Sequence, residues 1–320
     1  MSDNKRRHLL QWLSAYGPYL ALAALLLLCC ISSPGFRKPQ NLLNITRQVS
    51  YSGIIALGMT FVIVAGGIDL SVGSLLAFAG TLGILAMNAV GDSWGGLCVA
   101  IVVSLGAGLL GGALNGALIN VGRLPPFIAT LGTMSIFRSL TLQIAHAGTL
   151  TTSNPHYGDM GGAVFLGLSL PSWFLFVLTA LGAAILQRTR FGRHVCATGS
   201  NERVARYAAI RTRWVSFATY AMVGLLAGLS GLLLGGRLSS IRSSTAGQSY
   251  ELDAIAAAII GGTAMSGGKG SLAGTLAGVL ILGIIANVLV MWGVSANLQD
   301  TVKGVVIIAA VLLQRKPETT

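Results

Sequence analysis

The stretch GLCVAIVVSLGAGLLGGALNGALINV, residues 96–121, contains no Asp, Glu, Lys or Arg. An α-helix of about 20 such residues is long enough to cross the hydrocarbon core of a bilayer. Within it, Gly108, Gly112 and Gly116 recur at a spacing of four, which places them on one side of a helix. Small residues at this spacing let two helices approach closely in lipid. The stretch therefore predicts a membrane-spanning helix that packs tightly against a neighbour.

Comparable apolar segments recur along the rest of the chain, which is 53% hydrophobic and only 9% charged. A soluble domain carries about 25% charged residues, so the natural solvent of this chain is lipid. The fold class predicted is all-α, a polytopic transmembrane helical bundle of about ten spans. The eighth span is short, as is the tenth, and the second lies so close to the third that one of them could be broken or re-entrant. The predicted spans are roughly 16–32, 49–67, 71–90, 96–121, 126–145, 171–187, 214–235, 252–266, 271–292 and 300–314.

The distribution of Lys and Arg predicts the orientation, because cytoplasmic loops carry an excess of positive residues. With ten spans, one side of the membrane receives fourteen of the 21 Lys and Arg residues and the other side receives five. Arg138 and Lys303 fall inside spans. We therefore expect both termini in the cytoplasm, together with residues 188–213, and we expect the loop 146–170 on the outside.

Several function classes are excluded by the same sequence. The net charge of +12 comes from clusters between apolar runs, which is the pattern of a membrane protein and not of a nucleic-acid-binding protein. Residues 263–270, TAMSGGKG, resemble a phosphate loop but lack its first Gly and its final Ser or Thr. Neither the four cysteines nor the four histidines have the spacing of a disulfide framework or a metal site. We predict no enzyme activity, no metal and no cofactor, so any ATPase must be a separate protein.

The acidic residues bear on the energy source. Ion-coupled carriers usually bury carboxylates near the middle of the membrane as ion or proton sites. The nine acidic residues here fall in loops or at the ends of predicted spans. This pattern disfavours an ion-coupled secondary carrier of a small solute, which nevertheless stays open as the alternative function.

Residues 66–74, GGIDLSVGS, place a lone acid between two predicted spans. Ser71 and Ser74 are of the type that caps the start of the next helix. The segment is interpreted either as a gate on the cytoplasmic side or as a tight turn that only anchors two helices. Its candidate residues are Gly66, Gly67, Asp69, Ser71 and Gly73.

Residues 188–213 form the longest predicted cytoplasmic loop and carry seven arginines. Ser200 or Asn201 can start a short helix, with Glu202 in its first turn against the positive end of the helix dipole. Val204 and the alanines that follow give this helix a small apolar face, which suits docking into the groove of a partner. The other interpretation is a basic loop that lies on anionic membrane lipid. The candidate docking residues are Gly199, Asn201, Glu202, Arg203, Ala205, Arg206, Ala208 and Ala209.

Five blocks of sequence, in order between about residues 35 and 314, carry a resemblance to a known family. They are ALGMT at 56–60, GGIDLSVGS at 66–74, PFIATLG at 126–132, RTRFG at 188–192 with GSN at 199–201, and YELDAIA at 250–256 continuing to Gly270. With these blocks the chain resembles the ribose-type permease subunits of bacterial ATP-binding-cassette (ABC) monosaccharide importers. Many members have Gly-Gly-Asn where this chain has Gly199-Ser200-Asn201.

The resemblance implies a single permease domain over residues 1–320, in the inner membrane of a bacterium. It implies cytoplasmic tails at 1–15 and 315–320, a membrane bundle over 16–314 and an ATPase-coupling loop at 188–213. The implied partners are an ABC ATPase, a periplasmic sugar-binding protein and a second permease, either identical or a sister protein. The implied function is to form the translocation path for a monosaccharide, whose identity the sequence leaves open.

Overall fold

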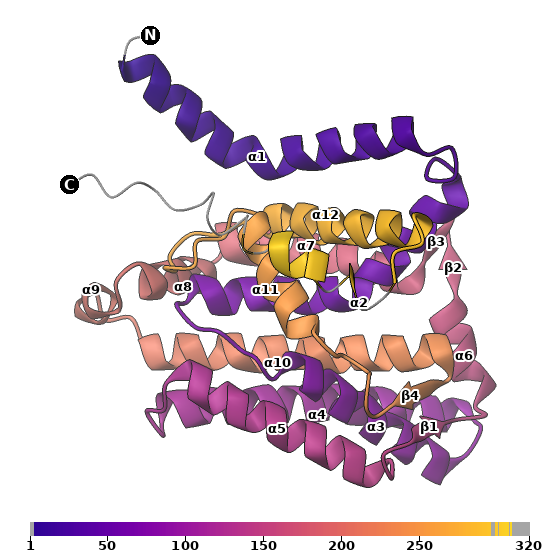
Figure 1. Ribbon diagram of the computed structural model, residues 1–320. Coiled ribbons are helices and arrows are strands. Elements are labelled where there is room, and N and C mark those ends of the chain that lie inside the picture. The colour runs from indigo at the N-terminus through magenta and orange to yellow at the C-terminus, as the bar shows by residue number, and fades with distance from the viewer. Residues whose placement is uncertain (1–2, 296–297, 300, 307, 309–320) are drawn as a thin grey trace.

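The computed structural model describes residues 3–295, 298–299, 301–306 and 308 (Figure 1). Most of them lie in helices that run side by side along one axis. The helices are α1 (Asp3–Ser32), α2 (Pro39–Val64), α3 (Val72–Val90), α4 (Trp94–Asn120), α5 (Pro126–Ile144), α6 (Pro155–Gly162), α7 (Leu170–Arg188), α8 (Arg190–Ser200), α9 (Glu202–Tyr207), α10 (Thr212–Leu238), α11 (Tyr250–Ile260) and α12 (Leu272–Met291). The strands are β1 (Thr149–Thr151), β2 (Val164–Phe165), β3 (Leu168–Ser169) and β4 (Ser240–Arg242).

Seven helices of the described chain are long and apolar enough to cross a membrane: α2, α3, α4, α5, α7, α10 and α12. The all-α polytopic fold predicted from the sequence is thus confirmed. Helix α1 contributes a shorter apolar stretch, Tyr16–Ser32, and is continuous with most of the tail predicted at 1–15. The eighth predicted span corresponds to the short helix α11. Most of the tenth, 300–314, and the tail 315–320 lie outside the described residues, so the count of ten stays a prediction.

Helix α2 forms the centre of the bundle because it is apolar on every side. From Val49 to Val64 every residue except Ser52 is buried. A helix that is hydrophobic all round needs neighbours on all sides. Helix α2 has them in α7, α10, α11 and α12. The core of the protein therefore surrounds this helix.

Helices α4 and α10 cross at a row of glycines. Gly108 and Gly112 of α4 lie against Gly224 and Gly228 of α10. A methyl group added to any of the four would collide with the opposite backbone. The spacing of four in the sequence predicted this close packing, and the structure confirms it. The crossing therefore sets the distance between the axes of α4 and α10.

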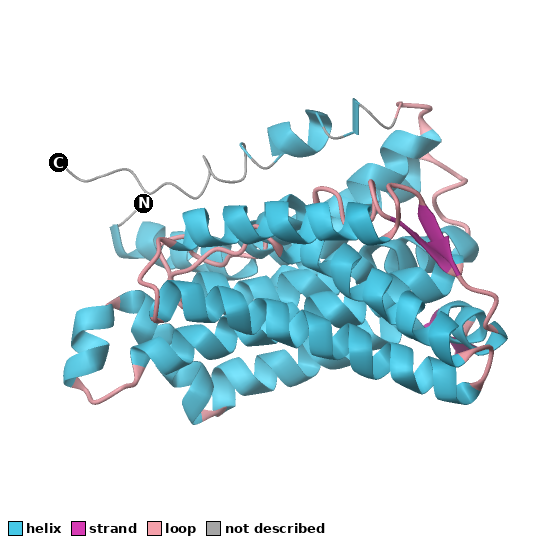
Figure 2. Cartoon of the chain, turned by 90° about the horizontal axis from the view of Figure 1, so that it is seen from below, coloured by secondary structure: helices cyan, strands magenta, loops and turns pink. Residues whose placement is uncertain are grey.

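The two ends of the bundle differ in structure. Helices α8 and α9 lie at one end, whereas α6 and all four described strands lie at the other (Figures 1 and 2). Strand β1 pairs antiparallel with β4, so that Leu150 lies opposite Ile241, and β2 pairs with β3. Residues 188–213 and the loop 146–170 are thus at opposite ends. The predicted orientation requires this arrangement, and which end faces the cytoplasm stays a prediction.

Two non-helical segments enter the bundle from its two ends. Residues 65–71 leave the end of α2 near α8 and run back toward the middle, where α3 begins (Figure 1). Residues 243–249 enter from the strand end and lead into α11, which has 11 residues. The second segment meets the first turn of α3, where Gly247 lies backbone to backbone with Gly73. The interruption suspected between the second and third spans is therefore the segment 65–71.

Candidate functional site

Asp69 lies at the centre of a buried hydrogen-bond network and is 0% exposed. Its Oδ1 accepts hydrogen bonds from the backbone N–H and the hydroxyl of Ser71, at 2.8 and 2.7 Å. Its Oδ2 accepts one from the side-chain amide of Asn115 in α4, at 3.1 Å. Thr133 of α5 in turn donates to Asn115 Oδ1, at 2.7 Å. The network ties the segment 65–71 to two spanning helices.

Ser71 differs from its predicted role as a helix cap. It occupies the capping position of α3, but its side chain makes no capping hydrogen bond. The hydroxyl instead donates to Asp69 and accepts from the Asn115 amide at 2.8 Å. The carboxyl group of Asp69, two residues upstream, binds this hydroxyl in place of the backbone of α3. Ser71 therefore serves the Asp69 network and not the first turn of α3.

The glycines of the same segment have separate structural causes. Gly66 has φ +90°, a left-handed conformation that L side chains rarely adopt, and it ends α2. Gly67 lies directly under the hydroxyl of Tyr220, which donates to the carbonyl of Ile68 at 3.1 Å. Gly73 contacts Gly247, as described above. All five candidate residues of this segment are thus held by specific contacts.

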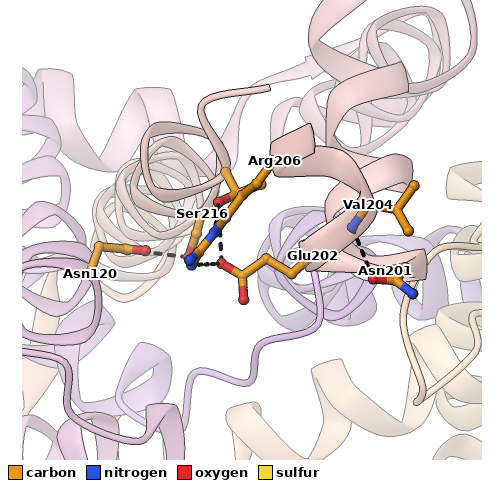
Figure 3. A network of polar contacts seen from close by, with 7 residues as sticks. Asn120, Asn201, Glu202, Val204, Arg206 and Ser216 are labelled. Atoms are coloured by element: carbon orange, nitrogen blue, oxygen red, sulfur yellow. Dashed lines mark hydrogen bonds and ion pairs between the residues drawn. The ribbon is translucent and has the colours of Figure 1, made fainter. Parts of the chain in front are cut away.

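The predicted docking helix is present as α9. Asn201, and not Ser200, begins it: its side-chain oxygen accepts a hydrogen bond from the backbone N–H of Val204 at 3.1 Å (Figure 3). Glu202 lies in the first turn, where the helix dipole favours a negative charge. Helix α8 precedes α9 and ends at Ser200, so the loop contains two short helices where the sequence predicted one.

One residue of the predicted apolar face of α9, Ala205, is buried, whereas Val204, Ala208 and Ala209 are exposed as predicted. Ala205 is only 3% exposed and packs inward, so it cannot belong to an exposed docking face. Tyr207 is 91% exposed and Val204 is 60% exposed, and Ala208 and Ala209 are also exposed. In so short a helix the inward position was set by how α9 rests on the start of α10, which the sequence does not reveal. The exposed apolar surface therefore consists of Val204, Tyr207, Ala208 and Ala209.

A polar network fixes α9 to the start of α10. Arg206 forms an ion pair with Glu202 one turn earlier, and its Nε donates to the hydroxyl of Thr212 at 3.2 Å (Figure 3). The same hydroxyl donates to Glu202 at 3.2 Å. Arg203 forms no hydrogen bond or ion pair with the described residues. Arg206 therefore holds the loop in place, whereas Arg203 lies on its exposed side.

Gly199 joins the loop to the end of α2. A side chain at this position would collide with the carbonyl of Val64 and with the backbone of Gly268. The N–H of Gly268 donates to that same carbonyl at 2.8 Å. Three chain segments therefore cross within backbone contact of one another: the end of α8, the end of α2 and the turn between α11 and α12.

A polar pocket of about 650 Å³ lies between the segment 65–71 and the loop 188–213, and residues of both line it. Gly66 and Gly67 contribute from the segment 65–71, and Asn201, Glu202 and Arg206 contribute from the loop. Asn120 on its wall donates to the hydroxyl of Ser216 at 3.2 Å (Figure 3). The structure thus brings together two sets of residues that lie more than a hundred positions apart in the sequence.

Sequence reasoning missed other polar residues inside the bundle. Asn115 was a usable signal, because it is a lone amide in an otherwise apolar span. Arg138, which the sequence places inside a span, donates to the carbonyl of Ser243 at 2.8 Å and so holds the segment 243–249 against α5. Lys303 forms an ion pair with Asp253 of α11 at 3.3 Å. The sequence alone does not reveal that Arg138 contacts Ser243 or that Lys303 contacts Asp253.

Helical bundles whose helices are interrupted within the membrane are typical of transport proteins. The fold and the site therefore define a polytopic membrane protein of the transporter class. A family model described as "Branched-chain amino acid transport system / permease component" matches residues 41–311, and the chain belongs to this family of permeases.

Individual relatives agree with this assignment. The chain is 43% identical over 317 residues to the Ribose import permease protein RbsC of Bacillus subtilis (strain 168). The matched region covers 98% of this chain and 97% of the relative. It is 40% identical over 311 residues to the protein of the same name from Escherichia coli (strain K12), with 96% and 95% covered. It is 31% identical over 300 residues to the L-arabinose transport system permease protein AraH of that strain, with 94% and 90% covered.

Proposed function

We propose that this chain is the membrane permease subunit of an ABC importer and that it forms the translocation path for a monosaccharide. The observation that carries the proposal is the near full-length similarity to permeases named for the import of ribose and of arabinose. Both named sugars are aldopentoses, so we favour a pentose as the transported sugar. The chain would act in the inner membrane of a bacterium as a multi-pass protein.

Three partners follow from this proposal. A separate ABC ATPase would supply the energy and dock on the end of the bundle that carries α8 and α9. A binding protein outside the membrane would deliver the sugar to the opposite end, where β1, β4 and α6 lie. A second permease, identical or a sister protein, would complete the path. In this orientation both termini are cytoplasmic, which agrees with the charge bias of the sequence.

The coupling role falls to α9 and its exposed face. Aromatic side chains such as that of Tyr207 are frequent energetic anchors of interfaces, and this one is 91% exposed. A movement of α9 caused by the ATPase would displace the end of α2, because the backbone of Gly199 contacts that of Val64. The rigid Glu202, Arg206 and Thr212 network would transmit the same movement to α10.

The gate would lie at the segment 65–71. This segment borders the same polar pocket as the coupling loop, and it is anchored by Asp69 to α4 and through Asn115 to α5. A displacement of α2 relative to α4 must therefore stretch or break hydrogen bonds of a buried carboxylate. Gly66 and Gly67 provide a backbone hinge at the start of the segment.

The deciding experiment is uptake into proteoliposomes. We expect radiolabelled D-ribose or L-arabinose to enter only when the permease is reconstituted with its partner ATPase and binding protein, and only with ATP inside. Uptake by the permease alone on a proton or sodium gradient would favour the ion-coupled carrier instead. If deletion of the gene left the uptake of every monosaccharide unchanged, a role in sugar transport would be excluded.

A further inference from the structure

A cavity of about 120 Å³ lies between α2, α11, α12 and the helical segment 301–306. Its walls include apolar side chains such as Val49 and Leu282. They also include five side chains that can form hydrogen bonds: Gln48, Ser52, Tyr250, Asp253 and Lys303. It is separate from the pocket beside α9, because the two have no lining residue in common.

The cavity lies at membrane depth, in the half of the bundle nearer the strands. Gln48 and Ser52 are about 14 and 20 Å along α2 from its start, at about 1.5 Å per residue. Closer to that start, Asn41 of α2 and Asn287 of α12 exchange two side-chain hydrogen bonds of 3.1 and 2.9 Å. This amide pair joins the two helices at their outer ends, and the cavity opens below it.

An ion pair forms part of the cavity wall. Asp253 Oδ2 lies 3.3 Å from Lys303 Nζ, and both side chains are mostly buried. Ionisable residues in membrane-spanning regions are costly, and they usually face the bundle interior or a water-filled cavity on a substrate path. Here the paired groups border open volume.

The helix that provides Tyr250 and Asp253 is itself interrupted. Helix α11 is about 16 Å long at about 1.5 Å per residue, roughly half the thickness of the hydrocarbon core. It begins inside the bundle, after the segment 243–249 that Arg138 holds in place. Substrate sites in transporters are typically formed by such discontinuous helices near the middle of the membrane. Tyr250 and Asp253 occupy the first turn, where a site of this kind is expected.

The size and chemistry of the cavity fit one small sugar. A single water molecule needs about 10–15 Å³, so the cavity of about 120 Å³ has room for a ligand much larger than one water molecule. The hydroxyl groups of an aldopentose both donate and accept hydrogen bonds, and the wall offers a carboxylate, an ammonium, an amide and hydroxyls in return. The apolar wall would face the C–H surface of the sugar ring.

We propose that this cavity is a monosaccharide-binding site within the permease, used during passage of the sugar. Asp253 and Lys303 would hold sugar hydroxyls by charge-assisted hydrogen bonds, and Gln48 and Ser52 would hold others from α2. The inference rests on the proposed function, because it takes the transported substrate to be a monosaccharide. The proposed site is a direct contact between the sugar and the permease. Delivery of the sugar by a binding protein does not by itself require such a contact.

Occupancy of the cavity is tested by protection of a cysteine. Ser52→Cys is made in a protein whose four native cysteines are replaced, and the assembled transporter is placed in lipid nanodiscs. We expect a membrane-impermeant methanethiosulfonate to react with this cysteine, and millimolar D-ribose to slow the reaction several-fold. L-Ribose, the mirror image, should protect less. Asn44→Cys, about two turns closer to the outer end of α2 and not part of the cavity wall, should react at the same rate with either sugar.

Transport of D-ribose provides the second readout. Gln48→Leu keeps the volume of the side chain but removes its hydrogen bonds, and Asp253→Asn keeps the shape but removes the charge. Each should lower uptake at saturating loaded binding protein by about tenfold, the equivalent of about 1.4 kcal/mol in the barrier. Asn44→Leu makes a matched change outside the cavity and should transport normally. Co-purification of the ATPase should be the same for all of these variants.

The outcomes separate the two proposals. If the unmodified transporter takes up no monosaccharide, the proposed function fails and the site fails with it. If it takes up D-ribose while Ser52→Cys is unreactive or unprotected, and while Gln48→Leu and Asp253→Asn transport normally, the cavity is not a sugar site and the proposed function stands.

Discussion

The side-chain amide of Asn115 donates to the carboxylate of Asp69 across 46 positions of sequence, with a distance of 3.1 Å between nitrogen and oxygen. Both residues are fully buried. The same amide also donates to Ser71, so both of its N–H groups are used by the segment 65–71. An unsatisfied buried donor costs about 1–3 kcal/mol, and the partnership is therefore expected to fix this segment firmly on α4.

Replacing Asp69 by Asn should reduce transport while the protein still reaches the membrane. The substitution leaves one oxygen for Ser71 but places a second amide N–H₂ group against that of Asn115, so at least one buried donor loses its partner. We expect a loss of about 1–3 kcal/mol in the stability of the purified permease, together with a several-fold lower uptake rate. Thermal unfolding in detergent and uptake in proteoliposomes measure the two effects.

The exchanged pair, Asp69→Asn with Asn115→Asp, is the control. It restores a carboxylate opposite an amide, and the new carboxylate can still accept from Thr133. If the exchange restores both stability and uptake, the segment is only an anchored turn. If it restores stability alone, the position of the charge matters to gating. Normal uptake by Asp69→Asn itself would rule out a gate that depends on this charge.

The glycine crossing between α4 and α10 should tolerate no side chain. Gly112→Ala places a methyl group onto the carbonyl of Tyr220 and the backbone of Gly224. Overpacking of this kind typically costs about 1–3 kcal/mol, and here the colliding atoms belong to the backbone and cannot turn aside. We expect the variant to unfold at a clearly lower temperature than the unmodified permease. Size-exclusion chromatography of heated samples measures this temperature.

Gly106→Ala is the matched control, since it lies on the same helix with no atom within 4 Å of an added methyl group. Ala is favoured over Gly in helices by about 1 kcal/mol, so this variant should be as stable as the unmodified protein or slightly more so. Equal destabilisation by both substitutions would mean that α4 and α10 do not pack through this face.

The fold could be predicted largely because lipid imposes few choices. Apolar runs, the spacing of glycines and the bias of Lys and Arg all follow from the bilayer as solvent, and they predicted the spanning helices and the tight crossing. The resemblance of several sequence blocks predicted the permease family, which the comparisons confirm. These signals are local in sequence, so a single sequence reveals them.

The polar partners inside the bundle could not be predicted, because they join distant segments. Nothing near Asp69 indicates Asn115, and nothing near Asp253 indicates Lys303. The inward face of α9 was also missed, because a helix of six residues has too few turns to show periodicity. Its capping residue was predictable to within one position, since Asn201 acts through a contact with Val204 only three residues away.

The orientation of the permease can be tested with two exposed serines at opposite ends of the bundle, Ser200 at the end of α8 and Ser153 between β1 and α6. With the four native cysteines replaced, Ser153→Cys should react in intact cells with an impermeant thiol reagent. Ser200→Cys should react only after the membrane is broken. Burial raises the pKa of the Cys196 thiol and so slows its reaction, but its position in α8 makes its replacement necessary. The reverse pattern of labelling would invert the topology.

The last prediction concerns the contact through which ATP hydrolysis drives the permease. The exposed side of α9 presents Tyr207 and Ala208, whereas Ala205 faces the protein interior. Ala208→Trp adds bulk where a partner groove would close on the helix, and Tyr207→Ala removes the aromatic side chain expected to anchor it. Loss of an anchor of this kind costs about 2 kcal/mol or more. We expect both variants to lose ATPase co-purification and binding-protein-stimulated ATP hydrolysis while they remain folded and inserted.

Three further substitutions distinguish docking from the internal structure of the loop. Arg203→Ala should have a small effect, because an exposed ion pair contributes about 1 kcal/mol or less. Arg206→Ala breaks the link between α9 and Thr212, so it should weaken stimulation of the ATPase more than its binding. Ala205→Trp should disturb the loop itself, because this side chain is buried, and it should therefore lower thermal stability even without the ATPase. If Ala208→Trp and Tyr207→Ala both kept normal complex formation and normal stimulation, α9 would not be the coupling element, and contact of this basic loop with anionic lipid would be the better explanation of its charge.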